Sequence, residues 1–232
     1  MRIISWNLRD GGRSGDGHQR LARAVDIVRA HGPDLDSFQE ARGFDGRLLD
    51  DMVGRPRLSG FLATADSGYH VAAFTRTELA ATCTRFGRPD FFHALIALRL
   101  LLSDGGTLYA LGAHWCPDFP DTRLTEAANL IELVRADEPT LLVGDLNSPD
   151  PHGDHPPDLR PEDRARYCAS DSTTADTRAL RRLESAGLVD VGRLRGETGP
   201  TLPTCCTDSA GSPGPSSRPG TFSGAFTRPC TR

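Results

Sequence analysis

Four short apolar segments of this 232-residue chain end in polar side chains, although they lie far apart in the sequence. The segments end at Asn7, Glu40, His114 and Asp145, and the last one continues to Asn147. Short apolar runs of this kind predict β-strands. Polar side chains at strand ends converge on one rim of a sheet, where a rigid scaffold fixes their geometry. We therefore expect these residues to share one site.

The spacing of apolar residues elsewhere predicts helices and further strands. Residues 19–31, 121–134 and 176–186 repeat apolar side chains at helical intervals. The expected strands are 2–8, 34–41, 61–64, 71–75, 94–102, 108–113, 140–143 and 188–191. Helices interspersed with many strands, including a hairpin at Asp104-Gly105-Gly106, indicate a mixed α/β (α+β) layered fold.

Length and composition set limits on the class of protein. With 38% hydrophobic residues, the chain supports one substantial core. No apolar run approaches the ~20 residues of a membrane-spanning helix, and the N-terminus lacks a secretory signal pattern, so we expect a cytoplasmic protein. The six cysteines have no zinc-ligand spacing. A net charge of −4 argues against binding of long nucleic acid by charge alone. The sequence does not specify an oligomeric state.

The polar side chains at the strand ends have the chemistry of a magnesium site. They comprise two carboxylates, two carboxamides and one imidazole, an oxygen-rich set that suits Mg²⁺, with Mn²⁺ as the alternative cation. Each residue alone has an ordinary explanation: Asn7 as a turn residue, Glu40 as a solvated acid, and His114 as a packed histidine. A calcium-binding loop starting at Asp145 fails, because Pro156 stands where the closing glutamate belongs. Their joint order favours a phosphoesterase-type site.

The quoted segments resemble the endonuclease/exonuclease/phosphatase superfamily, which has a deoxyribonuclease-I-like fold. The resemblance rests on Ile4-Ser5-Trp6-Asn7-Leu8, Pro33-Asp34-Leu35-Asp36-Ser37-Phe38-Gln39-Glu40, Gly112-Ala113-His114 and Gly144-Asp145-Leu146-Asn147-Ser148, followed by Ala186-Gly187-Leu188-Val189-Asp190. It implies a four-layer sandwich of two mixed, mostly antiparallel sheets flanked by helices. It also implies hydrolysis of phosphoester bonds by a nuclease or phosphatase.

The resemblance assigns expected roles to the matching positions. Glu40 would hold Mg²⁺, with Asn7 beside it. Asp145 would orient and deprotonate the attacking water, and Asn147 would donate a hydrogen bond to a phosphoryl oxygen. His114 would lie near the phosphate or the leaving group. We add from the sequence alone the phosphate-binding candidates flanking the expected rim, Arg9, Arg42 and Arg76.

The C-terminal part of the chain departs from the family pattern. The superfamily ends with a Ser-Asp-His segment on a final strand, whereas no histidine follows His155 here. We therefore expect residues 1–204 to form the domain, the final strand to be missing, and residues 205–232 to be an irregular tail. A single-nucleotide frameshift near Thr204 would explain both features, and resequencing the gene tests it. Asp154-His155 is the candidate replacement, although a solvated loop explains that pair more simply.

Two hypotheses of different class follow. In the first, the chain is a Mg²⁺-dependent phosphoesterase whose activity is reduced by the missing Asp-His segment. In the second, it is a catalytically inactive scaffold of the same fold. The substrate, whether DNA, RNA, a phosphoinositide or a small phosphoester, is not specified by the shared motifs.

Overall fold

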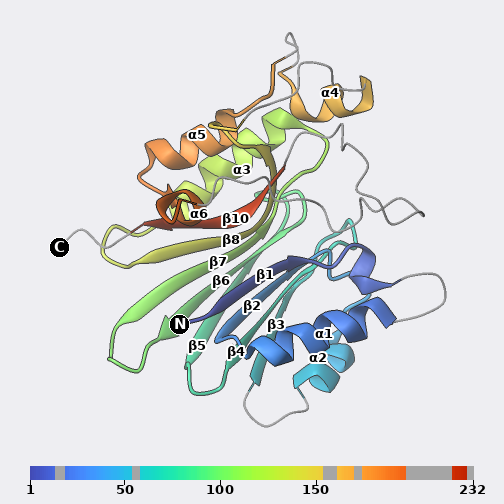
Figure 1. Cartoon of the computed structure of the whole chain (residues 1–232), viewed down its shortest axis with the longest axis vertical. Coiled ribbons are helices and arrows are strands. Elements are labelled where there is room, and N and C mark those ends of the chain that lie inside the picture. Colours follow the sequence, from blue (N-terminus) through green and yellow to red (C-terminus); the bar gives the residue numbers. More distant parts are fainter. Residues whose placement is uncertain (14–18, 54–57, 154–160, 170–173, 197–220, 229–232) are drawn as a thin grey trace.

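The computed structural model describes residues 1–13, 19–53, 58–153, 161–169, 174–196 and 221–228. Two sheets pack face to face, and helices cover the outer face of each (Figure 1). The four-layer sandwich is therefore confirmed. None of the described helices combines the length and the hydrophobicity that a membrane span requires.

The smaller sheet contains the N-terminal part of the chain. Its strand order is β1-β2-β4-β3, with β1 parallel to β2 and the other neighbours antiparallel. The strands are β1 Ile3–Asn7, β2 Leu35–Gln39, β3 Leu58–Ala63 and β4 Val71–Arg76. Helices α1 (Gln19–His31) and α2 (Gly46–Val53) cover its outer face, and a short 3-10 turn, η1 (Asp10–Gly12), follows β1.

The larger sheet has the strand order β5-β6-β7-β8-β10-β9. Its strands are β5 Ala81–Phe86, β6 Ala94–Leu101, β7 Thr107–His114, β8 Thr140–Pro149, β9 Val189–Asp190 and β10 Thr221–Arg228. The helices of this half are α3 Pro120–Leu133, α4 Pro161–Tyr167, α5 Arg178–Ser185 and α6 Val191–Leu194. The hairpin expected at residues 104–106 joins β6 to β7, whereas β8 extends beyond its expected end and contains Asp145 and Asn147.

Three hydrophobic clusters hold the layers together. One lies between the larger sheet and helices α3 and α5, one lies between the two sheets, and one lies beneath α1. Fully buried side chains such as Leu95, Leu111 and Leu130 form the first cluster, and Ile96, Leu98 and Leu100 belong to the one between the sheets. Burial of each such side chain contributes roughly 1.5–3 kcal/mol, so the packing of the layers fixes the positions of the strand ends.

The prediction that the final strand is missing is wrong. Strand β10 pairs antiparallel with β8 along most of its length, and with β9 on its other side. Its Phe226 is 2% exposed and joins the core beneath α5. The local composition suggested an irregular tail, but long-range pairing and burial override weak local strand preference. Residues 205–220 and 229–232 of the expected tail lie outside the described residues, so the frameshift stays a hypothesis.

Candidate active site

The ends of strands from both sheets meet at one point of the sandwich. Asn7 ends β1 opposite Gln39 of β2, and Glu40 follows directly. The Nδ2 of Asn7 donates to Glu40 Oε1 at 3.0 Å and to Asp145 Oδ2 at 2.9 Å. Because Asp145 belongs to β8 of the other sheet, one amide joins carboxylates from both sheets.

The backbone is strained at this point. Among the described residues, the only non-glycine residues with positive φ are Arg9, Asp10, Glu40 and Asn147. Such conformations cost of order 1–3 kcal/mol each and persist where surrounding contacts hold them. All of them lie in or beside the group formed by Asn7 and the two carboxylates. The contacts of this region therefore hold these strained residues in place. We call Asn7, Glu40, Asp145 and Asn147 the Asn7 cluster.

Asn147 is fixed at both its backbone and its side chain. Its backbone N–H donates to Asp145 Oδ1 at 3.0 Å, and its Nδ2 donates to the Trp115 carbonyl at 2.9 Å. The residue is 8% exposed. A carboxamide nitrogen carries two hydrogens, so one of them can serve a ligand while the other holds the side chain in place.

His114 lies beside Asp145 at the end of β7. The two residues are partners in the parallel β7–β8 ladder, and Trp115 N donates to the Asp145 carbonyl at 3.0 Å. Burial lowers the pKa of His114 to about 3. The imidazole is therefore neutral at physiological pH.

The three candidate arginines are placed very differently. Arg9 is exposed beside the Asn7 cluster, and its backbone N donates to Asn7 Oδ1 at 2.8 Å. Arg42 is paired with Asp10 at 3.1 Å. Arg76 lies at the opposite end of β4, where it pairs with Asp34 at 3.2 Å.

Arg76 is therefore removed from the phosphate-binding candidates. Asp34 and Glu40 stand at opposite ends of β2, which places them roughly 20 Å apart at the rise of a strand. Arg76 is a candidate in the sequence because it lies close to an expected strand. That closeness does not say at which end of the sheet the side chain lies.

Sequence reasoning missed three residues around the site. Asp10 donates its backbone N–H to Glu40 Oε2 at 3.0 Å, and its carboxylate accepts from Tyr69 Oη at 3.4 Å. His93 stacks on His114, with ring centroids 4.3 Å apart. Asp10 in Asp-Gly-Gly resembles a plain turn residue, and nothing in the local sequence separates His93 or Tyr69 from packed aromatic residues.

The donor set fits a hard divalent cation. The Glu40 carboxylate accepts hydrogen bonds from Asn7 Nδ2 and Asp10 N, both uncharged donors. In the described part of the chain, no cationic side chain forms an ion pair with Glu40. No group of three or more His, Cys, Asp or Glu side chains forms a complete metal cage there. Mg²⁺ characteristically uses one or two carboxylates together with water and substrate oxygens.

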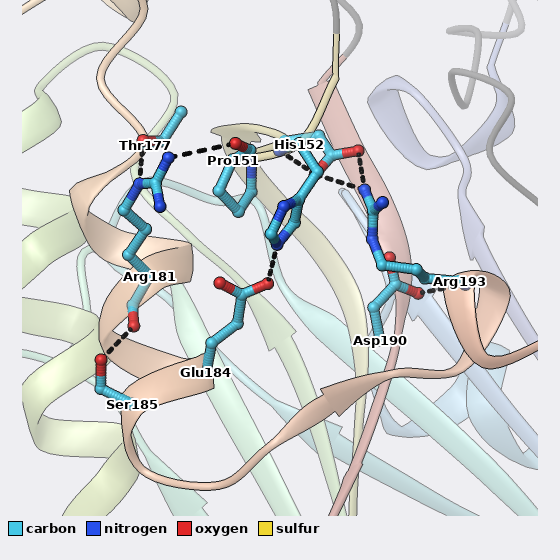
Figure 2. Close-up of polar contacts among 9 residues, drawn as sticks. Pro151, His152, Thr177, Arg181, Glu184, Ser185, Asp190 and Arg193 are labelled. Carbon is cyan, nitrogen blue, oxygen red and sulfur yellow. Dashed lines mark hydrogen bonds and ion pairs between the residues drawn. The ribbon is translucent and has the colours of Figure 1, made fainter.

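The acidic loop after β8 contacts helices α5 and α6. Arg193 of α6 contacts both carboxylate oxygens of Asp150, at 3.0 and 3.2 Å, and His152 Nε2 lies 2.7 Å from Glu184 of α5. Figure 2 shows the contact of His152 with Glu184 and the position of Arg193 beside the loop. We call these four residues the β8-loop clamp. Asp154-His155, the candidate replacement for the terminal pair, lies outside the described residues.

The sequence model of the Endonuclease/Exonuclease/phosphatase family matches residues 4–226. The chain belongs to this family. Membership supports phosphoester hydrolysis as the general activity. Strand β10 pairs with β8, which carries Asp145 and Asn147, but β10 contains no histidine.

Solved structures of the endonuclease/exonuclease/phosphatase family are similar in fold at low sequence identity. Humanized D. rerio TDP2 has a TM-score of 0.67 and 16% identity, with 100% of this chain and 84% of that chain covered. The endonuclease/exonuclease/phosphatase from Beutenbergia cavernae DSM 12333 has a TM-score of 0.68 and 15% identity, with 98% and 64% covered. An AP endonuclease from Archaeoglobus fulgidus has a TM-score of 0.65 and 16% identity, with 98% and 86% covered. A search of curated proteins finds no match.

Proposed function

We propose that the chain hydrolyses a phosphoester bond with the help of bound Mg²⁺, Mn²⁺ being the alternative cation. The observation that carries the proposal is the Asn7 amide, which joins Glu40 of one sheet to Asp145 of the other. A cytoplasmic location is part of the same proposal.

Glu40 would hold the ion, with Asn7 as a ligand or as the group that orients the glutamate. When bound, the ion supplies positive charge that stabilises the phosphoryl oxygens and assists departure of the leaving oxygen. The hydrogen bonds that the Glu40 carboxylate accepts from Asn7 Nδ2 and Asp10 N fix its direction. This fixed direction supports a ligand role, because a preorganised site loses little freedom when a ligand binds.

Asp145 would orient the attacking water and remove its proton. Its two carboxylate oxygens accept from Asn7 Nδ2 and from Asn147 N, so the group is held in one orientation. General-base catalysis of this kind contributes typically ~10²–10⁴-fold.

Asn147 and His114 would contact the phosphate. The Asn147 amide, held by the Trp115 carbonyl, would donate to an oxygen on which charge develops. Neutral His114 would hydrogen-bond a phosphoryl or leaving oxygen. Arg9 remains a phosphate-binding candidate beside the Asn7 cluster, and Arg42 would have to exchange its ion pair with Asp10.

An inactive scaffold is the second candidate. It is favoured by one observation, that β10 carries no histidine in the strand next to β8. The resemblance implies a histidine on the terminal strand that contacts the phosphate, and its loss would slow the reaction even with the Asn7 cluster intact.

Hydrolysis of bis(p-nitrophenyl) phosphate and nicking of plasmid DNA by the full chain, with Mg²⁺ and with EDTA, distinguish the two candidates. We expect Mg²⁺-dependent hydrolysis that falls ~10²–10⁴-fold in Asp145→Asn. The matched control is Asp26→Asn on the exposed face of α1, where the carboxylate forms an ion pair with Arg29. Equal rates for the parent and Asp145→Asn would establish the inactive scaffold.

Metal binding is tested separately from turnover. Mg²⁺ should raise the Tm of the parent, because a ligand that binds only the folded state stabilises it. Glu40→Gln should abolish this increase. An equal Mg²⁺-dependent increase in the variant would place the ion elsewhere.

Nucleic acid heads the substrate panel. D. rerio TDP2 has been solved in complex with a single-strand DNA product. The acidic balance of this chain, −4, weakens nonspecific attraction to DNA. Phosphoinositides and small phosphoesters therefore complete the panel.

A further inference from the structure

A second histidine packs directly against His114. The rings of His93 and His114 are nearly parallel, with an interplanar angle of 10° and centroids 4.3 Å apart. Both residues are 3% exposed. His93 precedes β6, the strand that pairs with β7, so the stack is built from two neighbouring strands of the larger sheet.

The His93 ring is fixed by a residue from the other sheet. Ser67 Oγ lies 2.7 Å from His93 Nδ1, and Ser67 is an exposed residue between β3 and β4. The edges of Tyr69 and Phe92 pack on the ring, with centroid distances of 5.6 and 4.9 Å. A hydrogen bond to one ring nitrogen fixes the orientation of an imidazole.

The segments that carry the two histidines are fastened to one buried side chain. Glu126 of α3 is 1% exposed, and its oxygens accept from Phe92 N and from Cys116 N, both at 2.9 Å. Phe92 adjoins His93, and Cys116 lies two residues after His114. The Glu126 carboxylate therefore anchors both backbone segments that carry the stacked histidines.

The stack retains polar atoms that the protein does not satisfy. His93 Nε2 and His114 Nδ1 are buried and have no hydrogen-bond partner among the described residues. Leaving such atoms buried costs free energy, and two apolar rings would pack here without that cost. The imidazoles are therefore better explained by the chemistry beside them than by stability.

We infer that His93 is a positioning residue, which together with Ser67 holds the His114 ring in one orientation beside Asp145. The inference rests on the proposed function, because His114 is the residue that would contact the phosphate. His93 would act through His114 and would not touch the substrate. It is distinct from the histidine that the terminal strand lacks.

The charges around the stack are consistent with a neutral pair. Burial, with the neighbouring His114 and Arg88 as lesser contributions, lowers the pKa of His93 to about 3, and Asp118 opposes the shift. Tyr69 faces the ring through its edge. Both rings are therefore uncharged near neutral pH, and they can stack without mutual repulsion.

Three variants and one control test the inference with bis(p-nitrophenyl) phosphate. Ser67→Ala should lower kcat ~10-fold with little change in KM, and Ser67→Thr, which keeps the hydroxyl, should restore it. His93→Phe, which keeps a ring for packing, should lower kcat ~10–100-fold. The control is His152→Gln in the β8-loop clamp, which should behave as the parent. Parent-like kcat in both Ser67→Ala and His93→Phe would overturn the inference.

A second measurement does not depend on turnover. In ¹⁵N-labelled protein, the ring-nitrogen signals of His114 should change in Ser67→Ala and return in Ser67→Thr. Unchanged His114 signals in Ser67→Ala would overturn the positioning role. If the parent hydrolyses none of the substrates, the proposed function has failed, and this experiment still decides whether Ser67, through His93, fixes the His114 ring.

Discussion

Two polar clusters, one that includes residues of β8 and one in the loop that follows it, differ in burial and in backbone conformation. In the Asn7 cluster, Asp145 and Asn147 are 9% and 8% exposed. In the β8-loop clamp, the side chains of His152 and Arg193 are 42% and 35% exposed. Both clusters contain acids that accept hydrogen bonds at ordinary distances. Polar density alone therefore does not identify a reactive site.

Backbone strain separates the two clusters. Glu40 and Asn147 have φ values of 51° and 48°, and the residues of the clamp are absent from the positive-φ residues in the described part of the chain. Strain is retained where a precise geometry is maintained at the expense of stability. The comparison predicts that changes in the Asn7 cluster affect activity, and that changes in the clamp affect stability slightly.

Among the variants that test this comparison, Asn147→Gly should have the largest effect. Glycine adopts positive φ without a steric penalty, so this variant keeps the backbone while removing the carboxamide. We expect kcat to fall ~10²–10³-fold, as for loss of an oxyanion donor. Thermal unfolding should show a Tm close to that of the parent, because relief of strain offsets the lost hydrogen bond to Trp115. A parent-like kcat would remove Asn147 from the site.

Two glycine substitutions sharpen the comparison at the level of the backbone. Gly144 has φ 146°, and a Cβ there would lie 2.0 Å from the Ala113 carbonyl oxygen. Gly144→Ala should therefore destabilise the fold by about 3 kcal/mol or more. The matched change in the loop of the clamp is Gly153→Ala, where the nearest atom would be Asp150 Cβ at 3.3 Å. Urea unfolding should show little change for Gly153→Ala, and equal losses for both variants would contradict the comparison.

Asp36 of β2, the strand that precedes Glu40, tests whether a buried carboxylate outside the Asn7 cluster affects stability rather than activity. It is 4% exposed, and its Oδ1 has no partner among the described residues. Side chains two apart share a face, so it faces the same way as Phe38, which packs in the cluster beneath α1. Burial raises the pKa of Asp36 to about 7.

The sign of the pH effect follows from this shift. The unfolded chain ionises Asp36 near its ordinary value of 3.8, whereas the folded chain ionises it near 7. The parent therefore loses stability relative to Asp36→Asn as pH rises from about 4 to about 7, by about 2–4 kcal/mol. The buried histidines of both proteins cancel in this difference. Urea unfolding at pH 4 and pH 8 measures it, and a difference independent of pH would contradict the assignment.

The sequence predicted the layers of the fold because their signals are local. The apolar spacing of residues 19–31 and the turn at residues 104–106 predicted α1 and the β6–β7 hairpin, both of which are confirmed. Strand β10 could not be predicted in the same way. Its place depends on pairing with β8 and β9, which are remote in sequence.

The same distinction between local signals and long-range contacts applies to the candidate site. Motif order identified Asn7, Glu40, Asp145 and Asn147, and the structure brings them together, although their roles stay predictions. It could not reveal that Arg76 lies at the other end of its sheet, since strand direction is a tertiary property. It also could not reveal the stack of His93 on His114, because the two residues meet only through the β6–β7 register.

The smallest expected effect is in the β8-loop clamp. Arg193→Gln removes the ion pair with Asp150, whose side chain is 28% exposed. Partly exposed pairs contribute roughly 0–1 kcal/mol, so urea unfolding should show a loss of that size. Asn147 should keep its position, because its backbone N–H donates to Asp145 and its side-chain amide donates to the Trp115 carbonyl, contacts that do not involve the clamp. kcat should therefore match the parent. A tenfold loss of kcat with an intact fold would contradict the comparison, because it would mean that the clamp and the Asn7 cluster act together in catalysis.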